Sequence, residues 1–549
     1  MRQVLRTAEF RRVEALPRRE HRWLLKCSQD LTAELKTEHG KMELRPVQAE
    51  ALIEAREQQG LLGALGVGFG KTLVSLLAPS VINAQRPLLL LPAQLKEITL
   101  GSIIPELSRH WKIRKDIQVE SYHAISNDRD LLNRLAPDLI ICDECHKMSR
   151  TNSARTRRLL RYLNENPETK FVGLSGTITR KSIKDYWHIL LAALKENAPL
   201  PMKWHEMNDW AMALDFGVHE AERYGIGALK YLLSDENRET AQQPSSTREQ
   251  KLDLAREGYR QRLVETPGVV ATSDKEIGSS LIIQKHSMPL PGTVADALLG
   301  LRNRWVTPAG EELTDAVDCW RKAREVAMGF YYQWEWEGAP DIEWLQARAD
   351  WRVFVRRITS RSHKYDTEML VANACREGKL LSPEFVAWQG IKERANPTTV
   401  ARWLTDEVLT NAIELATDTD TIVWYEQRAV GQRLNELTRW PLFDGDSVSL
   451  ISHLEHGGPC LASIKAHGVG VNLQHYNNSL VLTPPSSGAT WEQLLGRMHR
   501  QGQQAGAVTY TVYQHTPELI EAMDKALQNA EYIEKSIGQK QKLKYATLA

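Results

Sequence analysis

Short apolar runs alternate with longer amphipathic stretches along most of this chain. Near-continuous apolar strands separated by helices are typical of a parallel sheet covered on both faces. The first half predicts an α/β lobe over residues 41–235, preceded by a basic extension over residues 1–40. Its candidate strands are LLGAL (61–65), PLLLLP (87–92), IQVESY (117–122), DLIICD (138–143) and FVGLSG (171–176).

A polar stretch then interrupts the pattern, and a second α/β pattern follows it. Residues 236–250 are almost free of apolar side chains, so we predict a linker over residues 236–255. A second lobe is expected to begin over residues 256–415, with a helical insertion, and to continue over 416–549. Its candidate strands are SLIIQKHSMPL (280–290), TIVWYE (421–426), PCLASIK (459–465), SLVLTPP (479–485) and VTYTVYQ (508–514).

The helical region before residue 415 is rich in tryptophan. Aromatic side chains can stack on nucleic-acid bases, but these residues mostly sit beside other apolar residues at helical spacing. We therefore favour core packing for them over base stacking. The set comprises Trp305, Trp320, Trp334, Trp336, Trp344, Trp351, Trp388 and Trp403, which is eight of the 16 tryptophans in the chain.

Composition narrows the class of protein. The chain has 549 residues, of which 42% are hydrophobic and 25% charged, as in ordinary globular proteins. It has no apolar run long enough to span a membrane and no signal-peptide pattern at its start. Six cysteines form neither a disulfide framework nor a zinc pattern, so a reducing cytoplasm, bacterial or that of an infected host cell, is expected.

Charge by itself predicts no partner. The net charge is +1, so a nucleic-acid site has to be a local basic strip. Basic residues are dense in the first 26 positions. A solvated helix face is the favoured interpretation of this cluster, and a phosphate contact is the alternative.

The glycine-rich segment Gly66–Thr72 follows a small apolar strand and precedes a helical run. This context suits a phosphate-binding loop, in which glycines let backbone N–H groups turn toward phosphate oxygens. Lys71 would neutralise the β- and γ-phosphates of ATP, and the Thr72 hydroxyl would hold Mg²⁺. Gly66, Gly68 and Gly70 would form the cradle. The position of the usual first glycine is Leu65, so the strict eight-residue pattern is one residue short.

Two acids complete a hydrolytic site. Asp143 and Glu144 end the strand DLIICD, and the carboxyl ends of parallel strands are where ligands bind in such sheets. Asp143 can hold Mg²⁺, directly or through water. Glu144 can orient and deprotonate the attacking water.

Three further residues extend the site. Gln48 carries a side-chain amide with a donor and an acceptor, which can read the edge of adenine. Arg497 and Arg500 are three residues apart, on one helical face or turn, and a guanidinium at the γ-phosphate would stabilise transition-state charge. If the arginines come from the second lobe, hydrolysis becomes sensitive to lobe closure.

These residues together resemble the motifs of the superfamily 2 helicases, in particular the Swi/Snf-type DNA translocase branch. The ordered similarities are Arg45–Gln48 to the adenine-reading motif, Gly66–Thr72 to motif I, Leu89–Leu95 to motif Ia, Asp143–His146 to motif II, Ser175–Thr177 to motif III, Gly468–Leu473 to motif V and Gln493–Gln503 to motif VI. The helical region 291–415 matches none of them.

The resemblance implies two RecA-like lobes of the P-loop NTPase class with ATP and Mg²⁺ in the cleft between them. It implies that Gly470 binds nucleotide, and that His146, Ser175, Thr177 and Gln493 couple hydrolysis to movement along nucleic acid. Of the two arginines, Arg500 is the stronger candidate for the arginine finger, the guanidinium that contacts the γ-phosphate. Duplex DNA is the favoured polymer, and single-stranded DNA is the alternative. The lack of appended chromatin modules suggests a compact prokaryotic or phage-like member.

Two hypotheses of function follow. The first is an ATP-dependent DNA translocase or helicase that moves along duplex DNA or remodels it. The second is an ATP-gated clamp or scaffold without productive turnover, and an RNA-directed superfamily 2 helicase is a further alternative. The presence of Lys71, Asp143, Glu144 and Arg500 favours the enzyme, because a scaffold has no need of all four.

Overall fold

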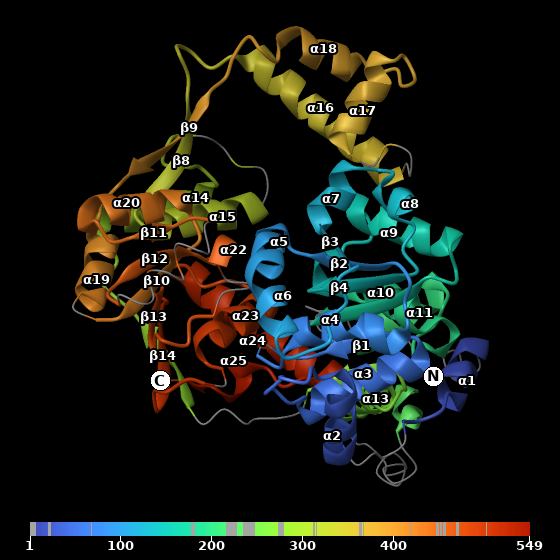
Figure 1. The fold of residues 1–549 in the computed structure, drawn as a ribbon. Coiled ribbons are helices and arrows are strands. Elements are labelled where there is room, and N and C mark those ends of the chain that lie inside the picture. Colours follow the sequence, from blue (N-terminus) through green and yellow to red (C-terminus); the bar gives the residue numbers. More distant parts are fainter. Residues whose placement is uncertain are drawn as a thin grey trace.

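The computed structural model consists of two α/β lobes and a projecting insertion (Figure 1). Each lobe is built on a parallel sheet, as the strand pattern predicted. The structure describes residues 7–19, 24–66, 68–176, 182–215, 228–233, 248–272, 279–310, 313, 316–361, 365, 367–417, 419–445, 450, 453, 457–467, 472–500 and 502–548.

The first lobe holds a six-stranded parallel sheet in the order β3-β2-β4-β5-β1-β6. Five of these strands coincide with predicted ones, because runs of apolar residues can be buried on both faces only between two helical layers. The strands are β1 (Gly60–Ala64), β2 (Pro87–Leu91), β3 (Gln118–Ser121), β4 (Leu139–Asp143), β5 (Lys170–Ser175) and β6 (Val269–Ala271).

Two cores lie on opposite faces of this sheet. Leu88 and Ile140 belong to one core, and their neighbours Leu89 and Ile141 belong to the other, as the two-residue period of a strand requires. The helices of the lobe are α1 (Ala8–Ala15), α2 (Leu24–Leu35), α3 (Pro46–Gln58), α4 (Lys71–Ile82), α5 (Ala93–Ile98), α6 (Ile104–Ser108), α7 (Tyr122–Asn127), α8 (Leu131–Leu135), α9 (Ala154–Glu165), α10 (Trp187–Leu194), α11 (Trp204–Leu214) and α13 (Arg248–Val264).

The first lobe extends further than the predicted boundary at residue 235. Strand β6 pairs with β1, and Tyr259 and Leu263 of α13 are buried in a core of the first lobe. The second half of the predicted linker is therefore a packed helix. The polar composition of residues 236–250 concealed it, and of this stretch residues 236–247 lie outside the described residues.

The basic extension is part of the first lobe. Phe10 of α1 lies in its core, and the Arg12 guanidinium donates to the backbone carbonyls of Ala198 and Leu200. Arg18 forms an ion pair with Glu265, and Arg19 donates to the carbonyl of Val264 at 2.7 Å. These arginines tie the N-terminal segment to the lobe, which neither the solvated-face nor the phosphate interpretation anticipated.

The second lobe holds a seven-stranded parallel sheet in the order β11-β12-β10-β13-β14-β7-β15. Its strands are β7 (Ser280–His286), β10 (Thr421–Tyr425), β11 (Leu442–Phe443), β12 (Cys460–Ser463), β13 (Asn478–Val481), β14 (Ala507–Tyr513) and β15 (Thr547–Leu548). Its helices are α14 (Gly292–Arg304), α15 (Ala316–Ala327), α19 (Glu407–Ala416), α20 (Arg428–Thr438), α22 (Ile464–His467), α23 (Gly488–Met498), α24 (Pro517–Ile537) and α25 (Lys542–Tyr545).

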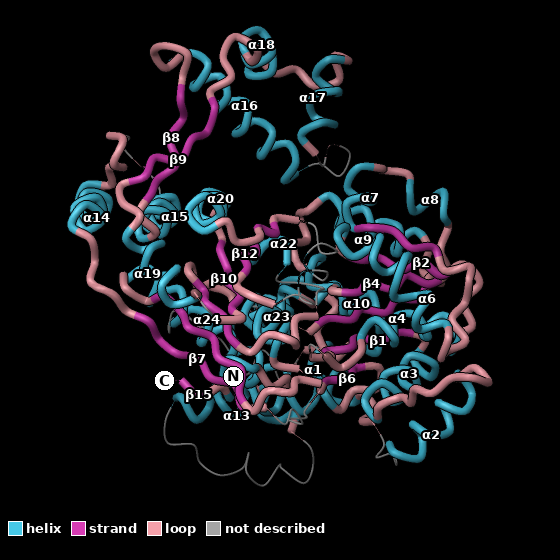
Figure 2. Tube along the Cα trace, turned by 60° about the vertical axis from the view of Figure 1, so that its left-hand side comes forward, coloured by secondary structure: helices cyan, strands magenta, loops and turns pink. Residues whose placement is uncertain are grey.

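The predicted helical insertion contains an antiparallel ribbon. Strands β8 (Phe330–Glu335) and β9 (Thr398–Trp403) pair with each other, and helices α16 (Ile342–Arg361), α17 (Glu368–Arg376) and α18 (Pro383–Ile391) stand at the far end of this ribbon (Figure 2). Local periodicity could not reveal a ribbon whose strands are separated by three helices. The insertion reaches back to the first lobe, where Arg157 of α9 donates to the carbonyl of Thr359 at 2.5 Å.

The tryptophans of this region divide between core and surface. Trp351 is buried against Phe385 in the core of the insertion, and Trp403 packs on Phe330. Trp305 is 40% exposed, which core packing did not predict.

Two chemical features agree with the sequence. All six cysteines are free thiols. Among the described residues, no helix is long and apolar enough to cross a membrane.

Candidate nucleotide site

The loop between β1 and α4 is shaped by two left-handed glycines. Gly68 has φ +91° and Gly70 has φ +74°, a region that side-chain-bearing residues rarely adopt. A Cβ on Gly70 would also lie 2.1 Å from the Gln48 amide nitrogen. Gly66 donates its N–H to Thr272 Oγ1 at 3.1 Å, and Val67 lies outside the described residues.

Lys71 begins α4 and lies buried at the cleft. Its Nζ is 3.3 Å from the Leu65 carbonyl oxygen and 3.6 Å from Glu144 Oε1. Thr72 follows on the first turn of the same helix. The lysine and the two acids predicted from sequence are therefore neighbours, and the ammonium group balances the charge of Glu144.

Asp143 ends β4 with an unsatisfied carboxylate. Its Oδ1 is buried and has no hydrogen-bond partner among the described residues. Burial and, to a smaller extent, the adjacent Glu144 raise the pKa of Asp143, Lys71 opposes them, and the resulting pKa is about 7. A carboxylate short of positive charge at a strand end fits a hard divalent cation, which prefers oxygen ligands.

Glu144 occupies an uncommon backbone conformation. Its φ is +58°, in the left-handed region that a non-glycine residue enters only under constraint from its surroundings. Burial would raise the pKa of its side chain, but Lys71, His146 and Arg497 outweigh that effect and lower the pKa. Glu144 is therefore an anion at neutral pH.

A polar chain links Glu144 to the second lobe. Ser175 Oγ donates to Glu144 Oε2 at 3.3 Å, and His146 Nδ1 lies 2.9 Å from Ser175 Oγ and 3.2 Å from Glu144 Oε2. The other ring nitrogen of His146 lies 3.5 Å from Nε2 of Gln493, on α23. Three of the four residues that the resemblance implies to couple hydrolysis to movement therefore lie together here, and the fourth, Thr177, lies outside the described residues.

The two arginines approach from the second lobe at different points. Arg497 lies in the last turn of α23, is 5% exposed, and its charge contributes to the lowered pKa of Glu144. Arg500 lies beyond the end of α23, and its Cβ is 3.6 Å from the position that a Cβ on Gly68 would occupy. The structure therefore brings both arginines to the first-lobe site, Arg497 near the acids and Arg500 near the glycine loop.

Gln48 lies on α3, and its side-chain amide is hydrogen-bonded to neighbouring backbone groups. Its Nε2 donates to the Phe69 carbonyl at 3.0 Å, and its Oε1 accepts the Arg45 N–H at 2.9 Å. The Arg45 guanidinium donates to the Gly68 carbonyl at 2.7 Å. Sequence reasoning singled out Gln48 and passed over Arg45 as a site residue, because only the fold shows that Arg45 contacts the glycine loop and lies close enough to Arg500 for its charge to lower the Arg500 pKa.

The segment of motif V is only partly described. Gly470 and its neighbours over 468–471 lie outside the described residues. Leu473, which follows them, donates its N–H to the Arg497 carbonyl at 3.0 Å. This part of the second lobe therefore adjoins the arginine helix.

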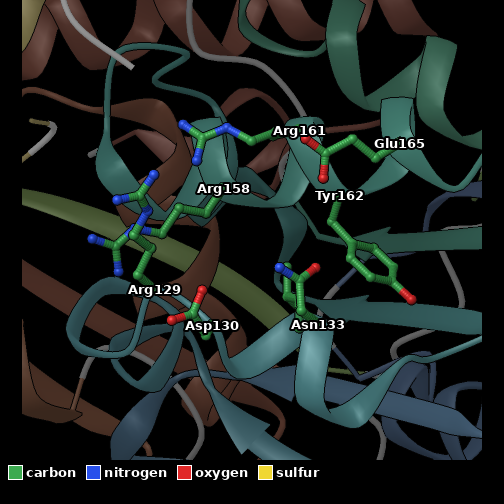
Figure 3. Close-up of a pocket in the computed structure, with 8 residues that line it drawn as sticks. Arg129, Asp130, Asn133, Arg158, Arg161, Tyr162 and Glu165 are labelled. Carbon is green, nitrogen blue, oxygen red and sulfur yellow. The ribbon is translucent and has the colours of Figure 1, made fainter. Parts of the chain in front are cut away.

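A separate hollow of about 230 Å³ opens on the first lobe between α8 and α9 (Figure 3). Three arginines line it, but Arg158 is committed to the carbonyls of Ile125 and Ser126. Asp130 and Glu165 offset the remaining positive charge. Its lining does not match a phosphate site.

The two parallel sheets with their helices are consistent with the RecA-like lobes of a P-loop NTPase fold. Residues 101–242 match the model of the SNF2-related domain, a segment that contains Asp143, Glu144 and Ser175. No curated protein matches the chain. Taken with the two parallel sheets, the match supports a Swi/Snf-type, helicase-like protein of superfamily 2.

Proposed function

We propose that the protein is a DNA-stimulated ATPase that translocates along duplex DNA or remodels it. The observation that carries this proposal is the convergence of Lys71 and Glu144 from one lobe with Arg497 from the other. A site divided between two lobes can convert nucleotide turnover into relative movement of the lobes. DNA as the polymer rests on the SNF2-related domain.

In this proposal Lys71 exchanges Glu144 for the β- and γ-phosphates when ATP binds. Thr72 and Asp143 would hold Mg²⁺, which neutralises charge on the phosphate oxygens. Once Lys71 no longer neutralises it, Glu144 becomes a stronger base for the attacking water. Gly66, Gly68 and Gly70 let the backbone approach the phosphates.

The second lobe supplies the remaining charge. Arg497 and Arg500 would stabilise the transition state when the lobes close. The polar contacts from Glu144 through His146 to Gln493 would make the position of α23 depend on whether the γ-phosphate is bound. In our proposal Thr177 and Gly470 contribute to coupling and nucleotide binding, and Gln48 reads adenine after it leaves the Phe69 carbonyl.

The experiment is an ATPase assay with no nucleic acid, single-stranded DNA, duplex DNA and RNA. Duplex DNA should stimulate the rate most, and the stimulation should fall steeply with rising salt, because each phosphate contact releases counterions. Maximal stimulation by RNA would favour the RNA-directed alternative. A rate indifferent to every nucleic acid would favour the clamp or an unrelated ATPase.

We also propose a reducing cytoplasm as its location. Cys142, Cys145 and Cys460 are buried free thiols, and burial raises the pKa of the Cys142 thiol to about 12, so it stays protonated and unreactive. Free thiols persist in reducing compartments.

A further inference from the structure

The joint between the β8–β9 ribbon and its helices contains a hollow of about 550 Å³. Its aromatic walls come from both sides of the joint. Trp334 belongs to the ribbon, Trp344 to α16 and Trp388 to α18, and all three line the hollow. Binding sites for small molecules and single nucleotides commonly fall in this size range.

Trp388 packs against the main core of the insertion, but Trp334 and Trp344 do not belong to that core. That core is formed by Trp351, Phe354, Val371, Ala372 and Phe385. The tryptophans of the hollow instead contact each other edge to face, with ring centroids 6.1 Å apart for Trp334 and Trp344 and 5.2 Å apart for Trp344 and Trp388. Trp334 and Trp388 remain only half-buried, so aromatic surface faces the hollow.

The lining of the hollow carries two cations, Arg348 and Lys392, and one acid. The Arg348 guanidinium lies over the rings of Trp334 and Trp344, at 5.1 and 5.6 Å from their centroids. Within the described part of the chain, Arg348 forms no ion pair. Lys392 adds a second cation, which forms an ion pair with Glu393, the one acid of the lining, at 3.8 Å. The Glu393 side chain is 89% exposed, so water screens this pair.

Aromatic walls beside Arg348, a cation without an ion pair among the described residues, suit a ligand with a flat ring and a nearby negative charge. A cationic ligand is disfavoured, because it would lie close to the positive charge of Arg348. A nucleotide unit of a single strand meets both requirements, since its base can stack on tryptophan and its phosphate can pair with arginine or lysine.

We propose that this hollow binds an unpaired base of a DNA strand. The identity of the polymer rests on the proposed function, but the hollow lies in the insertion, outside every helicase-like motif of the two lobes. Stacking at the joint would also hold the ribbon and the helices of the insertion in one arrangement, because Trp334 and Trp388 come from opposite sides of it.

The test measures binding without nucleotide, using an oligothymidylate of about 12 nucleotides at about 0.1 M salt. Wild type should bind with quenching of tryptophan fluorescence. Trp334→Leu should weaken binding at least about fivefold, the lower range for loss of one stacked base. The double variant Arg348→Gln/Lys392→Gln leaves the aromatic walls in place and should weaken binding similarly.

Matched controls lie nearby. Arg402→Gln removes a cation that pairs with Glu335 on the same ribbon, and Trp305→Leu removes an exposed tryptophan outside the hollow. Both should bind as wild type does. An abasic oligonucleotide of equal length should bind wild type as weakly as thymidylate binds Trp334→Leu.

Two results would overturn the proposal. One is unchanged thymidylate binding in the double variant, and the other is equal binding of the abasic strand and thymidylate by wild type. If either result is obtained and DNA still stimulates the ATPase, base binding by the hollow is rejected and the proposed function stands. If thymidylate binding follows the expected pattern but DNA does not change the ATPase rate, the proposed DNA-stimulated ATPase is rejected and base binding by the hollow stands.

Discussion

Tyr532 of α24 donates its phenolic hydroxyl to Asp215 Oδ1 at 2.8 Å, and both side chains are buried. The contact joins the last long helix of the second lobe to the end of α11 in the first. Gln539, just beyond α24, makes a second such contact by donating to the Gly176 carbonyl at 2.6 Å. The C-terminal segment therefore fastens the two lobes together beside the motif III loop.

The Asp215 contact predicts a dependence of stability on pH. Burial raises the pKa of Asp215 from 3.8 to about 6, and hydrogen bonds from Ser182 and Tyr532 only partly oppose that effect. The folded protein therefore holds this proton more tightly than the unfolded chain. Its stabilising contribution is full below about pH 4 and is lost as pH rises through 6, a change of about 3 kcal/mol.

Asp215→Asn tests this prediction, because an amide stays neutral and can still accept the Tyr532 hydroxyl. Thermal unfolding of both proteins should be followed from pH 4 to pH 7. The variant should gain stability relative to wild type as pH rises. A difference between the two proteins that does not change with pH would contradict the raised pKa.

Glu144→Gln should abolish ATP turnover and preserve ATP binding. The amide cannot accept the proton of the attacking water, and a positioned general base contributes about 10²- to 10⁴-fold in rate. Single-turnover hydrolysis and nucleotide affinity should be measured together. Glu165→Gln, at the separate hollow of the first lobe, is the matched control and should keep the wild-type rate. Turnover equal to wild type in Glu144→Gln would reject its role as base.

Arg497→Ala and Arg500→Ala should each lower kcat with a smaller effect on ATP affinity. An arginine that acts on transition-state charge contributes about 10³- to 10⁵-fold in known cases. The control is Arg428→Ala, whose side chain is 71% exposed in the second lobe and forms an ion pair with Asp444. If only one variant loses activity, that arginine is the finger and the other is structural.

Gln493→Ala should weaken the response to DNA more than the basal ATPase rate. The amide lies at the end of the chain that leads from Glu144 through His146 to the second lobe. Coupling between two sites is typically worth about 5- to 150-fold, so stimulation by duplex DNA should fall at least about fivefold. Equal loss of basal and stimulated rates would indicate a purely structural role.

Much of the fold was predictable because it rests on local patterns. Ten strands of the two sheets lie at predicted positions, since buried parallel strands need unbroken apolar runs. Strand β6 and helix α13 were missed for the opposite reason. Strand β6 belongs to the first lobe because it pairs with β1, some 200 residues earlier in the chain, and α13 belongs to it because Tyr259 and Leu263 are buried in its core. Neither contact has a local signature in the sequence.

The candidate site also combines residues that local sequence patterns predict with contacts that only the tertiary structure reveals. Lys71 and the acids at 143 and 144 could be found from sequence, because a glycine-rich loop and a strand end mark them locally. The inward orientation of Arg497, the contact of Arg45 with the loop and the polar chain through His146 depend on packing between the lobes.

The sequence by itself determined two parallel α/β lobes and the residue types of a candidate nucleotide site, because strand periodicity and loop chemistry are local properties. Only the tertiary structure decided where the first lobe ends, how α24 and Gln539 connect the two lobes, and that Trp334, Trp344 and Trp388 line a hollow. Those features depend on contacts between segments far apart in the chain, and such contacts form only when the whole chain is packed.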